Sequence, residues 1–293
     1  MLPADLQAAL PPACGRLQAS TPLAGGSIAQ TVRIDCESGS YALKYDTLAA
    51  TSTFAAEADG LAALAACPAI RVPQIIDAGR TQAHAWVLLE FIDCHPLAND
   101  LSGRAAGAAL AKLHRHIGTR HGWPQDNFLG STPQINTPHE DWATFFANCR
   151  LAPQIDLAER CADSAAQISL IARGRRLIER TPSILGHRPE PSLLHGDLWH
   201  GNVALDAQGR LTLLDPAVHC GDRECDLAMS RLFGGFPPAF YAGYIEAWPL
   251  PDGHAVREPM YRLYHVLNHL NLFGSAYRPE AEQLIAQLLA ASE

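Results

Sequence analysis

The sequence predicts an α+β protein of two lobes, a small β-rich lobe over residues 1–93 and a larger, mainly helical lobe over residues 94–293. Short apolar runs separated by Gly-Gly and Ser-Gly turns dominate as far as residue 92. Amphipathic patterns of helical period dominate after that point. A chain of 293 residues is also long enough to bury a core in each of two lobes.

The N-terminal lobe is predicted to hold about five strands and one helix. The helix is the segment TFAAEADGLAALAAC, because Phe54, Leu61 and Leu64 recur at helical spacing and Pro68 follows. The strands are predicted over 21–24, 28–35, 40–46, 72–78 and 85–92.

The C-terminal lobe begins with a helix over LSGRAAGAALAKLHRHI, which starts near Asp100 or Ser102. A loop-rich stretch follows it, and a strand–turn–strand pattern then covers PSLLHGD, GNVALD and RLTLLDP. Further helices are predicted over 139–149, 152–162 and 163–180, and over 224–292 with breaks at 234–238, 248–253 and 274–279.

Composition excludes several classes of function. The net charge is −8 and no Lys/Arg-rich run stands out, which argues against binding nucleic acid through its phosphates. No apolar run approaches the roughly 20 residues of a membrane span, and the N-terminus lacks the pattern of a secretory signal. The eight cysteines are scattered without a CxxC pair, so we expect reduced thiols and no zinc framework. We expect a cytoplasmic protein with neither a nucleic-acid nor a membrane partner.

Three polar residues stand at the ends of apolar runs in SLLHGDLWHGNVALDAQGRLTLLDPA. Asp197 follows a strand, Asn202 lies five positions later, and Asp215 closes the next apolar run. A hairpin that pairs 203–205 with 211–214 would bring Asp215 beside the loop that holds Asp197 and Asn202. Two carboxylates and an amide oxygen suit Mg²⁺ with bound phosphates.

The spacing D-x-x-x-x-N is also that of the kinase catalytic loop, in which the Asp accepts a hydroxyl proton and the Asn binds metal. Upstream, Lys44 lies in the predicted strand YALKY, and Glu57 lies in the following helix, where the phosphate-binding Lys and its partner are found in kinases. The turn Gly25-Gly26-Ser27 can present backbone N–H groups to phosphate. Only 2 of the 22 basic residues are lysines, so a Lys within an apolar strand favours a chemical role.

Each of these features also has a simpler explanation. The Gly25-Gly26 pair could be a plain hairpin turn, Lys44 could extend its stem from a strand edge into water, and Glu57 could be solvated. The case for a kinase depends on their joint order along the chain.

A metal-hydrolase cluster is a second interpretation of the same segment. His195, Asp197 and His200 are residue types that bind zinc. No H-E-x-x-H element accompanies them, and this interpretation leaves Lys44 unexplained. We expect His195 to be structural, packed beneath the loop and donating to backbone carbonyls.

The chain resembles the fructosamine kinases, or ketosamine-3-kinases, of the protein-kinase-like superfamily, beside aminoglycoside and choline kinases. The resemblance covers nearly the whole chain and is carried by LLHGDLWHGN, LLDPAVHCGDRECDLAM, FGGF, QDNFLGSTPQIN, DWATFF and Arg150. Trp199, after His-Gly-Asp-Leu, separates this family from the antibiotic kinases. Asp-Pro-Ala replaces the Asp-Phe-Gly of protein kinases, and no activation loop follows.

The resemblance implies a protein-kinase-like fold and ATP-dependent phosphorylation of the 3-hydroxyl of a ketosamine, free or linked to protein, in deglycation or repair. It implies that Asp197 is the base, that Asn202 and Asp215 hold Mg²⁺, and that Lys44 and Glu57 secure the nucleotide phosphates.

It further implies that the backbone at Glu90, Phe91 and Ile92 receives adenine and that Asp226 is a structural residue behind the catalytic loop. Trp199 lies two residues after the base and could form a wall of the acceptor pocket, although a core tryptophan that locks the loop is the alternative. A kinase for another hydroxylated amine, such as an aminoglycoside, and a nucleotide-binding pseudokinase remain open as functions.

Overall fold

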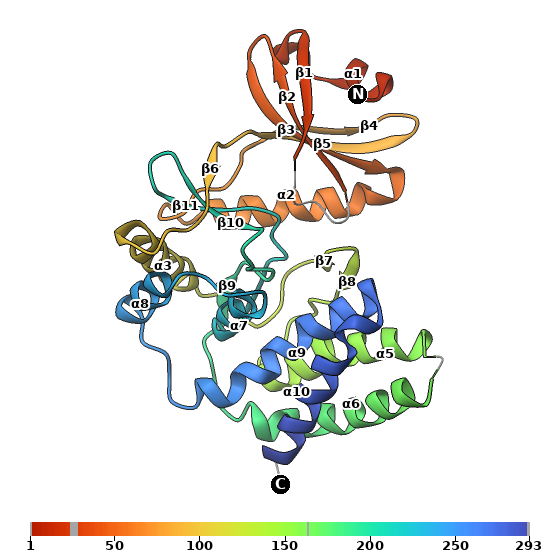
Figure 1. The fold of residues 1–293 in the computed structure, drawn as a ribbon, viewed down its shortest axis with the longest axis vertical. Helices are drawn as coiled ribbons and strands as arrows, with labels where there is room; N and C mark the ends of the chain where they lie inside the picture. Colours follow the sequence, from red (N-terminus) through yellow and green to blue (C-terminus); the bar gives the residue numbers. More distant parts are fainter. Residues whose placement is uncertain (1, 24–28, 163, 292–293) are drawn as a thin grey trace.

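An antiparallel sheet of five strands forms the N-terminal part of the chain (Figure 1). The computed structural model describes residues 2–23, 29–162 and 164–291. The strand order is β1-β2-β3-β5-β4, so β2, β3 and β5 pair with neighbours on both sides, and β5 has the most apolar sequence of the five. The strands are β1 (Leu17–Pro22), β2 (Gln30–Cys36), β3 (Gly39–Thr47), β4 (Ile75–Arg80) and β5 (His84–Glu90).

Helices cover both faces of this sheet. Alternate side chains of β5 point to opposite faces, and Val87 packs with Phe54 and Leu64 of α2 (Thr51–Ala65). On the other face, Trp86 packs in the cluster that contains Leu6 of the short helix α1 (Ala4–Ala9). The burial of Phe54, Leu61 and Leu64 agrees with their predicted helical spacing.

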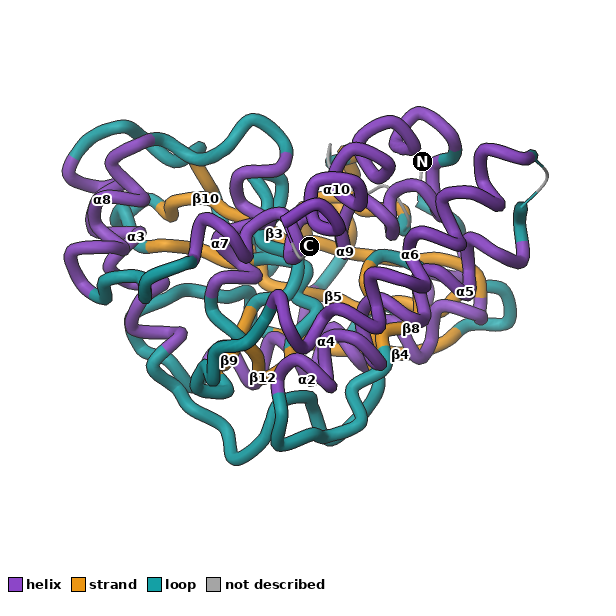
Figure 2. Tube along the Cα trace, turned by 90° about the horizontal axis from the view of Figure 1, so that it is seen from below, coloured by secondary structure: helices purple, strands orange, loops and turns teal. Residues whose placement is uncertain are grey.

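The C-terminal part is mainly helical and forms two groups (Figures 1 and 2). Helices α3 and α8 lie side by side, while α5, α6, α9 and α10 pack together at some distance from them. The side chain of Asp100 accepts hydrogen bonds from two N–H groups at the start of α3. This is the arrangement of an N-cap residue, as expected if the helix starts at Asp100. The helices are α3 (Leu101–His114), α4 (Trp142–Phe146), α5 (Ala152–Arg160), α6 (Ala165–Ile184), α7 (Glu224–Leu232), α8 (Pro238–Ala247), α9 (His254–Phe273) and α10 (Arg278–Ala291).

Three small sheets lie in the C-terminal part of the chain. They pair β6 (Cys94–His95) and β11 (Leu211–Leu213) with β10 (Val203–Asp206), β9 (Ser192–Leu194) with β12 (His219–Gly221), and β7 (Asn127–Leu129) with β8 (Thr132–Gln134). One apolar core continues from the five-stranded sheet through α2 to the β10–β11 hairpin and α3. This shared core holds the sheet against the segment that carries the polar residues described below.

Three predictions of secondary structure are wrong. Separate helices over 139–149 and 152–162 are in fact one run, because a π-helical turn over Ala147–Leu151 joins α4 to α5. Pro153, which has no N–H to donate, stands at the start of α5 and accounts for the altered register. The first strand begins at Leu17 instead of residue 21, and the predicted loop before residue 139 contains the β7–β8 hairpin. No helix in the described part of the chain has the length and apolarity to cross a membrane.

Candidate active site

Strand β3 and helix α2 bring Lys44 and Glu57 together. Lys44 stands opposite Thr31 of β2 and Val87 of β5, and it is only 8% exposed. Its Nζ donates to Oε1 of Glu57 at 2.6 Å and also contacts Oδ1 of Asp215. A single buried ammonium therefore joins the sheet, the helix and the segment that follows β11.

Electrostatics keep this ammonium charged. Burial alone would lower the pKa of Lys44, but the carboxylates of Asp215 and Glu57 outweigh burial and raise it. Burial raises the pKa of Glu57, an effect that the nearby Lys44 opposes. Lys44 is thus a fixed positive charge at the edge of the cleft.

The loop after β9 carries Asp197 and is held from behind by Asp226. The carboxylate of Asp226 accepts from the backbone N–H groups of His195 at 2.7 Å and Gly196 at 2.9 Å. Gly196 has a φ of +84°, and an added Cβ would lie 2.0 Å from the carbonyl oxygen of Ala217. Glycine is therefore the residue that fits immediately before Asp197.

Two buried histidines complete the support of this loop. His195 bonds the carbonyl oxygen of Leu214 through Nε2 at 2.8 Å, and its Nδ1 accepts from the backbone N–H of Asp197 at 3.2 Å. This pattern requires a neutral ring, in agreement with the burial that lowers the pKa of His195. Although burial favours protonation of Asp226, bonds from His114 and the loop backbone lower the pKa of Asp226 to about 2.

The β10–β11 hairpin returns the chain to the same loop, with the predicted pairing. Val203 stands opposite Leu213, and the N–H of Leu214 donates to the carbonyl oxygen of Asn202 at 2.9 Å. Asp215 follows with a φ of +52°, and among the described residues it is the only non-glycine with a positive φ. Such a backbone costs energy and is commonly kept at functional sites. It turns the Asp215 carboxylate toward Lys44.

Asp197 and Asn202 form a pair within the loop. Nδ2 of Asn202 donates to the carbonyl oxygen of Asp197 at 3.0 Å and to its Oδ2 at 3.1 Å. Burial, and after it the negative charge of Asp215, raise the pKa of Asp197 to about 7. These two effects outweigh the hydrogen bond from Asn202, which lowers the pKa. A carboxylate with this pKa can take up a proton near neutral pH.

These residues share one cleft. Lys44, Glu57, Asp197, Asn202 and Asp215 all line it, and so does Trp199, whose ring is partly exposed. Sequence reasoning missed the opposite wall, which is formed by Phe128, Leu129 and Gly130 of the β7–β8 hairpin and by Asn268, His269, Leu272 and Phe273 at the end of α9.

Other predicted site residues lie elsewhere. Glu90, Phe91 and Ile92 end β5 and begin the connector, and they are not part of the lining of this cleft. The Glu90 carboxylate contacts Arg71, and the guanidinium of Arg33 lies 4.5 Å from the Phe91 ring centroid. The predicted phosphate turn Gly25-Gly26-Ser27 falls outside the described residues.

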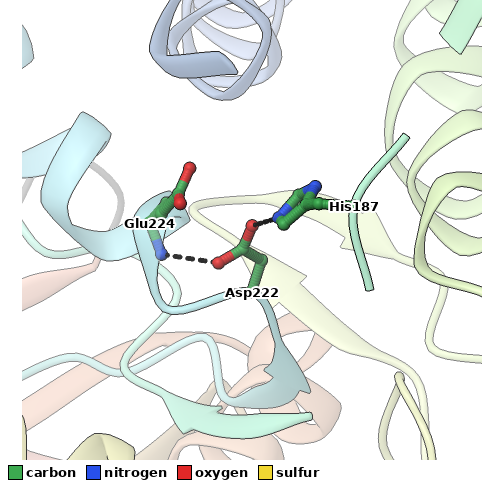
Figure 3. A group of neighbouring side chains, drawn as sticks. All are labelled: His187, Asp222 and Glu224. Atoms are coloured by element: carbon green, nitrogen blue, oxygen red, sulfur yellow. Dashed lines mark hydrogen bonds and ion pairs between the residues drawn. The ribbon is translucent and has the colours of Figure 1, made fainter. Parts of the chain in front are cut away.

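The metal-hydrolase interpretation is not supported by the geometry. Both ring nitrogens of His195 are occupied by bonds to the backbone, and His200 is exposed. A different trio, His187, Asp222 and Glu224, has ligand atoms within 4.8 Å of one another (Figure 3).

This trio already has protein partners. Asp222 bonds His187 and Tyr261 at 2.6 Å each, and both oxygens of Glu224 accept from Arg257 at 2.6 and 2.9 Å. Buried carboxylates satisfied in this way stabilise the base of α7 and leave little capacity for a cation.

Comparison with known proteins decides the family. The profile of the fructosamine kinase family matches residues 7–291. The chain belongs to the fructosamine kinase family. A probable ketoamine kinase of Synechocystis sp. is 40% identical over 276 residues, which are 94% of this chain and 91% of that protein. The protein-ribulosamine 3-kinase, chloroplastic, of Oryza sativa subsp. indica is 38% identical over 272 residues, 91% of this chain and 78% of that protein.

Solved structures confirm the protein-kinase-like fold of this family member. A crystal structure assigned as a fructosamine-3-kinase of Haemophilus somnus superposes with a TM-score of 0.83 at 31% identity, over 93% of this chain and 92% of that chain. Aminoglycoside phosphotransferase APH(4)-Ia, crystallised with AMP-PNP and hygromycin B, shares the fold with a TM-score of 0.65 at 17% identity, over 94% of both chains. The chain is an ATP-dependent phosphotransferase, as the sequence predicts.

Proposed function

We propose that this fructosamine kinase family member transfers the γ-phosphoryl group of ATP to the 3-hydroxyl of a ketosamine, of fructosamine or ribulosamine type. The observation that carries the proposal is the convergence of Lys44, Asp197, Asn202 and Asp215 on one cleft. Phosphoryl transfer needs a base for the acceptor, oxygen ligands for the metal and a cation for the phosphates, and these four residues supply all three.

Asp197 is the group that would take the acceptor proton. As the hydroxyl oxygen bonds to the γ-phosphorus, its proton passes to the Asp197 carboxylate, and the bond from the γ-phosphorus to the bridging oxygen breaks to release ADP. The bond from Asn202 orients one carboxylate oxygen of Asp197. A pKa of about 7 leaves much of the carboxylate ionised at neutral pH.

Asn202 and Asp215 fit a magnesium ion by their chemistry. The side-chain Nδ2 of Asn202 donates both of its hydrogen bonds to Asp197. The side-chain Oδ1 of Asn202 takes part in no hydrogen bond among the described residues. The Asp215 side chain is 45% exposed to the cleft and contacts a protein cation, Lys44, on one oxygen. Hard oxygen ligands of this kind suit Mg²⁺, which would neutralise charge on the ATP phosphates.

Lys44 would then hold the phosphates, with Glu57 as its anchor. Lys44 has two carboxylate partners, and its bond to Glu57 can persist while its contact with Asp215 gives way to phosphate. Support for adenine at Glu90–Ile92 comes from the N–H groups of Phe91 and Ile92, which form no backbone hydrogen bond with any described residue. Gly25, Gly26 and Ser27 remain the proposed phosphate turn.

We also propose the division into lobes at residues 93 and 94. Strand β5 ends at Glu90 in the five-stranded sheet, whereas Cys94 and His95 already pair with β10. Asp226 and His195 support the loop of the larger lobe, and Trp199 is proposed to contact the acceptor.

A substrate panel tests the proposal. ATP consumption is measured with a ribulosamine, a fructosamine and an aminoglycoside, with wild-type protein and with Asp197→Asn as the inactive control. Turnover of either ketosamine, lost in the control, supports the proposal and ranks the two sugars. Turnover of the aminoglycoside alone would contradict it, and ATP binding without turnover of any acceptor would indicate a pseudokinase.

A further inference from the structure

Arg150 is a buried cation without an ionic partner among the described residues. Its side chain is 1% exposed, and no salt bridge joins it to a described carboxylate. Nη1 donates to the carbonyl oxygens of Ile135 at 2.6 Å and Cys149 at 2.9 Å, and Nη2 donates to Oδ1 of Asn136 at 2.8 Å. Burial lowers the pKa of Arg150, yet a guanidinium stays protonated in proteins. Burying an uncompensated charge is costly, so stability alone does not explain this residue.

The backbone around Arg150 is unusual as well. The residue lies in the π-helical turn Ala147–Leu151 between α4 and α5. Such turns are rare in proteins, and those that occur are often found at functional sites. The guanidinium carbon lies 4.6 Å from the ring centroid of Phe145 and 5.7 Å from that of Tyr264. Ring faces compensate part of the charge and fix the plane of the guanidinium.

From Arg150 a chain of buried polar groups runs into the β7–β8 hairpin. Nδ2 of Asn136 and Nε2 of Gln134 both donate to Oδ1 of Asn127 at 2.8 Å. The hydroxyl of Tyr264, on α9, donates to Oε1 of Gln134 at 2.8 Å. We call Asn127, Gln134, Asn136, Arg150 and Tyr264 the hairpin network.

The hairpin network also holds the segment that follows the proposed metal ligand. Nδ2 of Asn127 donates to the carbonyl oxygen of Val218 at 2.7 Å, and Nε2 of Gln134 donates to that of Ala217 at 3.1 Å. These two carbonyls lie two and three positions after Asp215. The base of the hairpin and the Asp215 segment are thus bonded to the same two amides.

The tip of the same hairpin faces the cleft. Phe128, Leu129 and Gly130 line it together with Asp197 and the end of α9, whereas the connector at Glu90–Ile92 does not. A nucleotide that extends from the connector to Lys44 leaves the space between the hairpin tip and Asp197 to the acceptor.

We propose that Arg150 is a positioning residue, which acts through the hairpin network to fix the Phe128–Gly130 tip as the acceptor-side wall of the cleft. This inference rests on the proposed function, because that function defines which molecule the wall receives. A planar fork that binds three oxygen acceptors at once suits this task better than an ammonium.

Two tyrosines on α9 provide a matched test. Within the hairpin network, Tyr264→Phe removes the hydroxyl that donates to Gln134. Tyr261→Phe, three residues earlier, makes the same chemical change at another buried site, where the hydroxyl bonds Asp222 at 2.6 Å and Trp142 at 3.0 Å. Arg150→Met and Arg150→Lys complete the series, and Tyr264→Phe keeps the test usable if an Arg150 variant does not fold.

The readouts are KM for the ketosamine, KM for ATP, melting temperature, and amide hydrogen exchange of residues 127–134. Losing one buried hydrogen bond should raise the ketosamine KM of Tyr264→Phe about three- to tenfold, with KM for ATP within about twofold of wild type. Exchange of the hairpin should rise in the same variant. Tyr261→Phe should lower the melting temperature and leave the ketosamine KM and hairpin exchange near wild type. Arg150→Lys should raise the ketosamine KM and the hairpin exchange less than Arg150→Met does.

Three results would overturn the inference. One is an equal rise in ketosamine KM in both tyrosine variants, another is a parallel rise of both KM values in Tyr264→Phe, and the third is unchanged hairpin exchange in all network variants. Failure of the proposed function is a different result, in which wild-type protein turns over no ketosamine. If another acceptor is used, the same KM comparison applies to it. If no acceptor is used, the acceptor-wall inference fails with the proposed function, and hairpin exchange separately reports whether the network holds the tip.

Discussion

Replacing Asp197 with Asn should make the protein less active but more stable at neutral and alkaline pH. The pKa of Asp197 is raised from 3.8 to about 7 because the carboxylate is partly buried and lies near the negative charge of Asp215. The folded protein therefore carries a proton between about pH 4 and pH 7 that the unfolded chain has released. The contribution of Asp197 to the free energy of unfolding is greatest below about pH 4, falls as the pH rises to about 7, and is constant above it.

The size of the effect follows from the shift. About three pKa units correspond to roughly 4 kcal/mol at about 1.4 kcal/mol per unit. The Asp197 side chain is partly exposed, and solvent screening reduces this to about 1–3 kcal/mol. Asp197→Asn removes the charged form altogether. The variant should therefore exceed wild type in free energy of unfolding by about 1–3 kcal/mol near pH 8, and by about zero near pH 4.

Urea unfolding of both proteins at a series of pH values measures this difference. Other groups titrate equally in both proteins, so their contributions cancel in the difference between the two free energies of unfolding. The same variant should lose about 10²–10⁴-fold in kcat, as expected for a general base, with little change in ATP affinity. In the wild type, kcat/KM for the acceptor should fall as the pH drops below about 7.

Asp206→Asn is a control of opposite sign outside the cleft. Bonds from the backbone and side chain of Arg210 outweigh burial and lower the pKa of Asp206. Its contribution to stability is present above the unfolded pKa and is lost as the pH falls, so this variant should be destabilised most at neutral pH. A stability difference for Asp197→Asn that does not change between about pH 4 and pH 8 would refute the reasoning.

Three further substitutions test the remaining parts of the cleft. Lys44→Arg should lose most of kcat/KM, because a guanidinium cannot replace an ammonium shared between Glu57 and Asp215; wild-type turnover in this variant would make Lys44 a structural cation only. Asp215→Ala should abolish the effect of Mg²⁺ on ATP affinity, which nucleotide titration with and without the metal measures. Trp199→Ala should raise KM for the ketosamine while ATP affinity and melting temperature change little, because the ring lines the cleft. A loss of about 3–5 kcal/mol in stability would instead identify Trp199 as a core residue.

The parts of the site that are local in sequence were predictable. Asp197, Asn202 and Asp215 are joined by one short hairpin, whose pairing of Val203 with Leu213 follows from alternating apolar residues. Lys44 and Glu57 lie on a strand and on the helix directly after it. In both cases a few residues of regular structure determine the distance between the side chains.

The opposite wall of the cleft could not be placed from sequence. The sequence contains the family motif around Phe128, but this motif contacts the segment after Asp215, about 90 positions away, as in the bond from Asn127 to Val218. No local signal specifies such a contact, because it depends on how α4, α5 and α9 pack. The π-helical turn at Arg150 escaped prediction for a related reason, since Pro153 indicates a boundary and not the altered register that precedes it.

Two buried cations, Lys44 and Arg150, show why residue type has to be judged against geometry. Arginines make up 20 of the 22 basic residues, so the choice of Arg at position 150 says nothing by itself, whereas the choice of Lys at position 44 does. Lys44 shares one nitrogen between two carboxylates, and such a point charge can exchange Asp215 for a phosphate by a small movement. Arg150 spreads its donors over three neutral oxygens in a fixed plane, an arrangement suited to holding backbone in place. The geometry of Lys44 therefore suits the exchange of partners that we propose for the reaction, and the geometry of Arg150 suits the constant contacts that we propose for it.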